Sequence, residues 1–328
     1  MIVSIIMSLL LVAVFLLAVS WGSYTMSIGE VVSTLFGGGS KLQSTTIFDI
    51  RLPRICVAMV VAVCLSTSGC VLQSVTRNEL AEPGMIGINA GAALAVVLLI
   101  SSGQTTYYST IGDASLFVMP IVAIVGSLIS GLLIYRLSYK KGVSPTRLIL
   151  TGIGVNVGIN AFISLYQLNM AQGDYNQVLT WISGSLWGRS WKLFYLITPL
   201  ALIFLGLTIW KSKILDVLDL GDEIAIGLGV KVEKERKILF IYAITLAALA
   251  TSVAGNIAFL GLLGPQVAKR LVGPVHRRQI PMAAIVSCII VLFADSISRN
   301  VFSPIEIPVG ITIAIVGVPY FIYLMLKE

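Results

Sequence analysis

Long apolar runs separated by short polar or charged stretches dominate the hydrophobic pattern of this chain. A helix that crosses a bilayer needs about 20 apolar residues. By that criterion the pattern predicts ten spanning helices, at 2–20, 54–75, 86–101, 116–137, 147–169, 193–210, 238–257, 258–271, 281–300 and 308–326. The eighth run is short and flanked by Gly and Pro, so we expect it to be broken or packed inside the bundle.

The stretches between these runs are too short to form a separate domain. The longest are 21–53, 170–192 and 211–237. We therefore expect residues 1–328 to form a single transmembrane domain of the all-α class. The first run lacks a basic n-region and nine further runs follow it, so we interpret it as an uncleaved helix and not as a signal peptide.

The distribution of Lys and Arg predicts the topology, because cytoplasmic loops carry an excess of both. With both termini in the cytoplasm, 16 basic residues lie inside and 6 lie outside. This arrangement places 211–237 on the cytoplasmic face and the other two long stretches outside. The net charge of +7 then reflects topology and not nucleic-acid binding.

Composition narrows the class further. The chain is 57% hydrophobic and 11% charged, with a mean hydropathy of +0.97, whereas a soluble domain has about 25% charged residues. A soluble or disordered protein is thereby excluded. The single histidine, His276, excludes a multi-histidine metal site, and we expect no metal or cofactor in this chain. There is no Walker A motif, so any ATP and its Mg²⁺ must be bound by a partner ATPase.

Ionisable residues are scarce inside the predicted spans. Asp295 is the only carboxylate well inside one, and Arg299 follows it at i+4, where the two side chains share a helix face and can pair. Ion-coupled transporters usually carry functional carboxylates at membrane depth. The scarcity therefore counts against a proton- or sodium-coupled secondary transporter.

Polar residues form a stripe along the fifth predicted span. Asn156, Asn160, Ser164 and, less closely, Gln167 recur at helical spacing. Such a stripe either bonds neighbouring helices or lines a water-filled path, and it makes these four residues the pore-lining candidates. The same span contains Gly154-x-x-x-Gly158, a spacing that lets membrane helices approach closely.

The cytoplasmic stretch 211–237 predicts a short helix. Gly221 interrupts the chain, Asp222 and Glu223 suit the positive N-terminal end of a helix, and Gly227 and Gly229 suit its end. A short, firm helix on this face can be pushed by a partner. The alternative is an amphipathic interfacial helix that has no partner.

Several segments together form a recognisable series, in order and at natural spacing from about residue 45 to the C-terminus. They are RLPR (51–54), RNELAEPG (77–84), WISGSL (181–186), LGDEIAIGLG (220–229), FLGLLGP (259–265), RLVG (270–273), HR (276–277), ADSISR (294–299), EIPVG (306–310) and GVPYF (317–321). This series resembles the permease subunit of binding-protein-dependent ABC importers for iron–siderophore complexes, haem and vitamin B12. Two positions depart from the family pattern: Glu79 stands where Pro is common, and Gln266 where His is common.

The resemblance implies a ten-helix subunit built from two inverted repeats, paired with an identical or paralogous permease around a central path. It also implies a separate ATPase, an extracytoplasmic solute-binding protein and a ferric siderophore or related chelate as the solute. Vitamin B12 and haem remain as alternatives. We therefore expect a multi-pass cell-membrane permease that is not itself an enzyme.

The resemblance assigns roles to two groups of residues. It implies an ATPase-coupling role for Leu220, Gly221, Asp222, Glu223, Ala225 and Gly229. It implies that the outer arginines meet acidic residues of the binding protein; these are Arg51, Arg54 and Arg299. The alternative for the arginines is snorkelling or an internal pair with Asp49 or Asp295.

Three rival classes remain. An ion-coupled secondary transporter predicts function without an ATPase. A membrane enzyme would need a polar catalytic cluster, which a chain with one histidine and no metal-ligand set does not offer. A membrane scaffold would need neither the polar stripe nor the segment 211–237.

Overall fold

The computed structural model describes residues 2–22, 24–102, 115–140, 142–301, 303 and 305–327. Helices are the only extended regular elements in these ranges. Each of the ten predicted spans coincides with one helix to within six residues at either end. These helices are α1 (Ile2–Ser20), α4 (Leu52–Thr76), α5 (Ile88–Ser101), α7 (Ser115–Ser138), α8 (Pro145–Leu168), α10 (Trp191–Trp210), α13 (Val232–Ala254), α14 (Leu260–Val272), α15 (His276–Asn300) and α16 (Val309–Lys327).

The membrane assignment rests on length and hydropathy. Among the described residues, seven helices are long and apolar enough to cross a bilayer alone, while α5 and α16 are shorter apolar helices. The predicted eighth span, α14, has 13 residues, most of them buried, as expected for a short helix packed inside the bundle. The chain is therefore an all-α, multi-pass membrane protein.

The stretches between the spans contain further helices, which the apolar runs alone did not predict. They are α2 (Ile28–Leu35), α3 (Lys41–Ser44), the π-helical turn η1 (Thr45–Arg51), α9 (Gln172–Ile182), α11 (Ser212–Asp219) and α12 (Asp222–Gly227). The segment 211–237 thus holds two short helices where the sequence predicted one. Helix α3, η1 and α4 follow one another without a break, so a single rod runs from Lys41 to Thr76.

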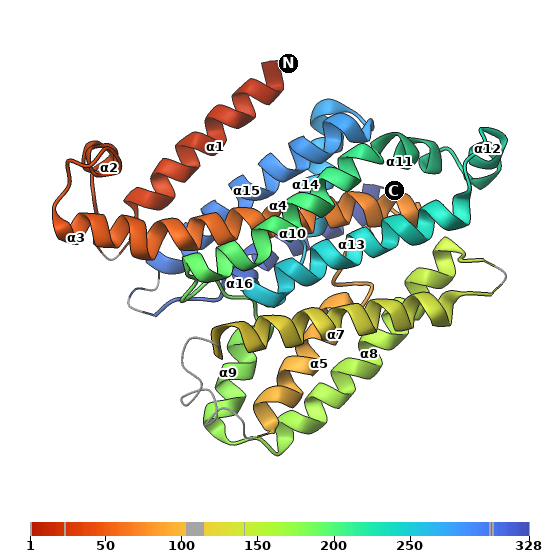
Figure 1. Ribbon diagram of the computed structural model, residues 1–328, viewed down its shortest axis with the longest axis horizontal. Coiled ribbons are helices and arrows are strands. Elements are labelled where there is room, and N and C mark those ends of the chain that lie inside the picture. The colour runs from red at the N-terminus through yellow and green to blue at the C-terminus, as the bar shows by residue number, and fades with distance from the viewer. Residues whose placement is uncertain are drawn as a thin grey trace.

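The helices form two groups (Figure 1). One group contains α4, α10, α13, α14, α15 and α16, with α1 packed on α15. The other contains α5, α7, α8 and α9. Helix α7 joins the groups, because it packs on both α5 and α13.

Helix α4 lies at the centre of the first group, packed against α13, α14 and α15. In the most apolar stretch of the rod Lys41–Thr76, 78% of the residues are buried. In the most apolar stretch of α8, only 17% are. Its small residues permit this closeness: a Cβ on Gly69 would lie 1.8 Å from the carbonyl oxygen of Gly261 in α14. Any larger residue at Gly69 would force α4 and α14 apart.

Two irregular segments lie between the helices of the core. The first, 77–87, follows α4, and the second, 255–259, follows α13. Their neighbouring side chains join them: Asn89 Nδ2 donates to Asn256 Oδ1 at 2.8 Å, and Thr251 Oγ1 donates to Asn89 Oδ1 at 3.0 Å. These bonds tie the start of α5, directly after the first segment, to α13 and to the second segment.

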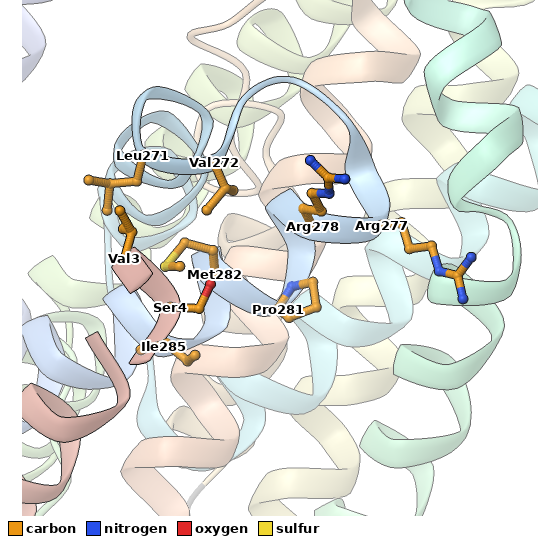
Figure 2. Close-up of a pocket in the computed structure, with 9 residues that line it drawn as sticks. All are labelled: Val3, Ser4, Leu271, Val272, Arg277, Arg278, Pro281, Met282 and Ile285. Carbon is orange, nitrogen blue, oxygen red and sulfur yellow. The ribbon is translucent and has the colours of Figure 1, made fainter. Parts of the chain in front are cut away.

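The bundle has two chemically distinct ends. The α12 end comprises α11, α12, the end of α4 and the start of α15. The start of α1 lies there too, because Val3 and Ser4 line a cavity of about 510 Å³ with Arg277 and Arg278 (Figure 2). The opposite end, called the arginine end, holds Arg54, Asp295 and Arg299.

Candidate functional sites

Helix α12 forms as the sequence predicts. Gly221 has φ +112°, a backbone conformation that few other residues adopt, and it separates α11 from α12. Asp222 and Glu223 occupy the first turn, where carboxylates are favourable against the helix dipole. The helix ends at Gly227, and Gly229 at φ +83° turns the chain towards α13.

The six residues with a predicted coupling role divide into two sets. Ala225 is fully buried and Gly221 half-buried, so both face the body of the protein. Asp222 also faces inward, because its Oδ1 accepts Arg236 Nη2 at 2.7 Å and also accepts Arg77 Nη2. The other three, Leu220, Glu223 and Gly229, are exposed.

Asp222 therefore anchors α12 to the spanning helices. The Arg236 side chain is 2% exposed and belongs to α13, and its Nη1 also donates to the Val143 carbonyl at 3.0 Å. Arg77 follows the last residue of α4. One carboxylate thus ties α12 to α13 and to the end of α4.

Sequence reasoning missed the apolar surface of α12. Ile224, Ile226 and Leu228 are exposed by 52%, 63% and 62%, beside Leu220 at 57%. Apolar residues gathered on a short, water-facing helix are typical of a surface that a partner covers. The signal was present in the sequence, since three aliphatic residues recur within five positions of a short polar segment.

The structure brings the three predicted docking arginines together at the arginine end, where all three are largely buried. Arg54 Nη2 contacts Asp295 Oδ1 at 2.8 Å, and its Nη1 contacts Glu306 Oε2 at 2.8 Å. Arg299 Nε lies 3.1 Å from Asp295 Oδ2, which confirms the pair predicted from their i,i+4 spacing. Two of the three arginines therefore have the internal partner Asp295.

Arg51 makes no such ion pair with Asp295. Its guanidinium donates to the backbone carbonyls of Val19, Ser20 and Tyr24, the Ser20 contact being 3.1 Å long. Carbonyl oxygens satisfy its donors without neutralising its charge. The cluster of Arg51, Arg54, Arg299, Asp295 and Glu306 therefore has one more positive than negative side chain.

A cavity opens beside this cluster. Its volume is about 220 Å³, and its lining includes Arg51, Arg54, Arg299 and Glu306. A fourth arginine, Arg189, lies close enough to feel the charge of Arg54, and burial lowers its pKa to about 10. Since that pKa remains well above 7, Arg189 adds another positive charge to this end of the molecule.

The polar stripe of α8 is only partly drawn into the protein. Asn156 is half-buried and donates to the Gly84 carbonyl at 3.3 Å, while Asn160 Nδ2 donates back to Asn156 Oδ1 at 2.8 Å. Both line a cavity of about 250 Å³. Ser164 is exposed and Gln167 half-buried, and neither is among the residues lining that cavity.

Sequence reasoning missed the carboxylate in this cavity, Glu82, which is 5% exposed. Residues 81–83 are buried, and a Cβ on Gly261 would lie 2.9 Å from Pro83 Cδ and 3.1 Å from the Leu65 carbonyl in the middle of α4. Glu82 lies close to the backbone of Phe259, the residue before α14.

The two departures from the family pattern contact each other. Gln266 Nε2 donates to the Glu79 carbonyl at 2.8 Å, and Lys269 Nζ pairs with Glu79 Oε1 at 2.6 Å. The pair joins segment 77–87 to α14. The residue that departs from the family pattern at 266 thus contacts the residue that departs from it at 79.

The comparisons with known proteins agree with this geometry. Residues 10–327 match the model of the FecCD transport family. The chain belongs to the FecCD transport family. It is 45% identical to the iron(3+)-hydroxamate import system permease protein FhuG of Bacillus subtilis (strain 168), over 97% of this chain and 95% of that protein.

Matches at lower identity also extend over nearly the whole chain. The Fe(3+)-citrate import system permease protein YfmE of Bacillus subtilis (strain 168) is 35% identical, over 98% of this chain and 94% of that protein. A solved structure of a metal-chelate type ABC transporter in an inward-facing conformation superposes with a TM-score of 0.86 at 28% identity, covering 98% of both chains. This FecCD-family chain is thus a transport permease.

Proposed function

We propose that this chain is the permease subunit of an ABC importer that carries a ferric hydroxamate or a closely related iron chelate across the cell membrane. The observation that carries the proposal is the match over nearly the whole chain to a family whose members include an iron(3+)-hydroxamate permease at 45% identity. Vitamin B12 and haem are less well supported, because the relatives compared above are named for iron chelates.

The ATPase binds at α12 in this proposal. The exposed aliphatic residues of α12 supply a surface for it, and Asp222 fixes that surface to α4 and α13. Because of this attachment, movement of α12 also moves α4 and α13. The chain itself hydrolyses nothing.

The solute-binding protein docks at the arginine end. Its support is the surplus of positive charge and the cavity that Arg51, Arg54 and Arg299 line. Carboxylates of an acidic partner suit such a surface, because charge complementarity steers association. The internal pairs with Asp295 and Glu306 hold two of the guanidinium groups in place.

A second permease subunit packs against α8, and the solute passes between the two subunits. Gly154 and Gly158 have no neighbouring atom within 4 Å of an added Cβ, so their face of α8 is open in a single chain. Asn160 and Ser164 are likewise exposed on α8. Polar residues on the outer face of α8 suit a solute path whose other wall is formed by the second subunit.

Both termini lie in the cytoplasm in this arrangement. Val3 lines the same cavity as Arg277 and Arg278, and the Arg270 guanidinium lies 5.9 Å from the Tyr323 ring near the end of α16. Both ends of the chain thus lie near the α12 end, which carries the predicted excess of basic residues.

Uptake by whole cells tests the substrate. A strain that lacks this chain is compared with the same strain carrying the wild-type gene, with radiolabelled metal supplied as ferric hydroxamate, ferric citrate, haem or vitamin B12. We expect deletion to abolish hydroxamate uptake and the gene to restore it. Undiminished hydroxamate uptake with loss of another solute would transfer the proposal to that solute, and no loss at all would refute it.

A further inference from the structure

His276, the only histidine in the sequence, links three helices at the α12 end. It is the first residue of α15 and is 2% exposed. Its backbone N–H and its Nδ1 lie 2.8 Å and 2.7 Å from Asp216 Oδ1, and its Nε2 lies 2.7 Å from Ser74 Oγ. Since a carboxylate only accepts, the Nδ1 atom carries a hydrogen and donates it to Asp216.

The two partners of His276 belong to different parts of the molecule. Asp216 lies in α11, which leads directly into α12, whereas Ser74 lies in the last turn of α4. One imidazole therefore bridges the cytoplasmic segment 211–237 and two spanning helices. A hydrogen bond to a charged group is also stronger than one between neutral groups, so the Asp216 contact resists separation of α11 from α15.

Apolar packing also holds α11, because Leu215 and Leu218 are buried. Packing of this kind is non-directional, however, and allows α11 to slide or rotate. A cavity of about 260 Å³ lies beside the imidazole and is lined by Ser74, His276, Asp219 and Lys269 among others. Directional bonds at His276 restrict movement of α11 that the cavity would otherwise permit.

The two spanning helices that meet His276 also carry the arginine end. Helix α4 carries Arg54 near its start and Ser74 near its end, and α15 begins at His276 and carries Asp295 and Arg299 near its end. The helices pack along their lengths, and the Arg54–Asp295 contact of 2.8 Å ties them at the far end. Polar bonds thus link α4 to α15 at both ends.

We propose that His276 is the positioning residue of a joint, formed with Asp216 and Ser74, through which movement of α11 and α12 displaces α4 and α15 as one unit. The inference rests on the proposed function, because it needs an ATPase that moves α12. It adds a specific route from that contact to the arginine end. Breaking the joint leaves α12 able to bind the ATPase but uncouples its movement from transport.

Coupling measured in proteoliposomes tests the joint. The complete complex is reconstituted with its ATPase and binding protein, and a radiolabelled ferric hydroxamate serves as the probe. The readout is the number of chelate molecules imported per ATP hydrolysed. We expect Asp216→Ala, which removes both hydrogen bonds that His276 donates to Asp216, and Ser74→Ala, which removes the contact with Nε2, each to lower this ratio by about tenfold, while the ATPase still co-purifies with the chain.

Two further variants separate the joint from a general structural role. Asp216→Asn keeps an oxygen that accepts the Nδ1 hydrogen, so we expect it to retain most of the ratio. Ser298→Ala removes a hydroxyl contact of the same 2.7 Å length, from α15 to Thr312 of α16, and we expect the wild-type ratio.

Three results would overturn the inference. The first is a wild-type ratio in Asp216→Ala and Ser74→Ala. The second is a parallel fall of transport and ATP hydrolysis in proportion to the amount of folded chain, which would show a structural role only. The third is a wild-type complex that binds no ATPase or imports no chelate, which would refute the proposed function and the joint with it.

Discussion

At the residue scale, Asp295 is the carboxylate on which the arginine end depends. It is fully buried between Arg54 and Arg299, which approach within 2.8 Å and 3.1 Å of its two oxygens. Removing one charge from a buried ion-pair cluster leaves its partners uncompensated. The positions of both arginines therefore depend on a fully buried side chain.

We predict that Asp295→Asn lowers the free energy of unfolding by about 3–5 kcal/mol, the usual cost of breaking a buried pair. Thermal unfolding of the detergent-solubilised chain, followed by size-exclusion chromatography, measures the change. The control is Asp49→Asn, since Asp49 is exposed on η1 of the same rod, and we expect its effect to stay within about 0.5 kcal/mol. Equal stability of the two variants would contradict the arrangement of the cluster.

At the element scale, α12 is a short helix whose two faces have different tasks. Ala225 and Asp222 attach it to the body, and Ile224 and Leu228 are exposed. A charge on the attached face would disturb the fold. A charge on the exposed face disturbs only what binds there.

We predict that Ile224→Glu weakens association with the ATPase by at least about tenfold, because an anchor residue at an interface contributes about 2 kcal/mol or more. The amount of chain in the membrane should remain at the wild-type level. Co-purification of the ATPase at graded concentrations measures the loss. Lys213→Glu, an exposed charge change on α11, is the control, and equal binding by both variants would remove α12 as the contact.

The sequence predicted those features of the fold and the sites that depend on residues close together in the chain. Span positions follow from apolar runs, and the limits of α12 follow from Gly221 and the acidic first turn, so both were predicted closely. The anchoring of Asp222 by Arg77 joins residues 145 positions apart, which no local pattern reveals. Glu82 escaped notice for the same reason, because its burial depends on segment 77–87 folding against α14.

At the scale of the whole molecule, the open face of α8 predicts assembly. We expect Gly154→Leu to abolish pairing of permease subunits while the single chain still folds, since an added Cβ meets no atom of its own chain. Gly206→Leu on α10 is the matched control, because Gly206 is equally unobstructed. Light scattering coupled to chromatography measures the mass, and a dimer that survives Gly154→Leu would place the interface elsewhere.

The central claim is that an ATPase acting at the α12 end drives this permease. The most direct measurement is import of a radiolabelled ferric hydroxamate into proteoliposomes that contain the purified complex, with ATP trapped in the lumen and the binding protein outside. The account predicts import that requires ATP and the binding protein, and that persists when ionophores collapse every ion gradient. Import driven by a proton or sodium gradient without ATP would contradict the account and restore the secondary-transporter interpretation.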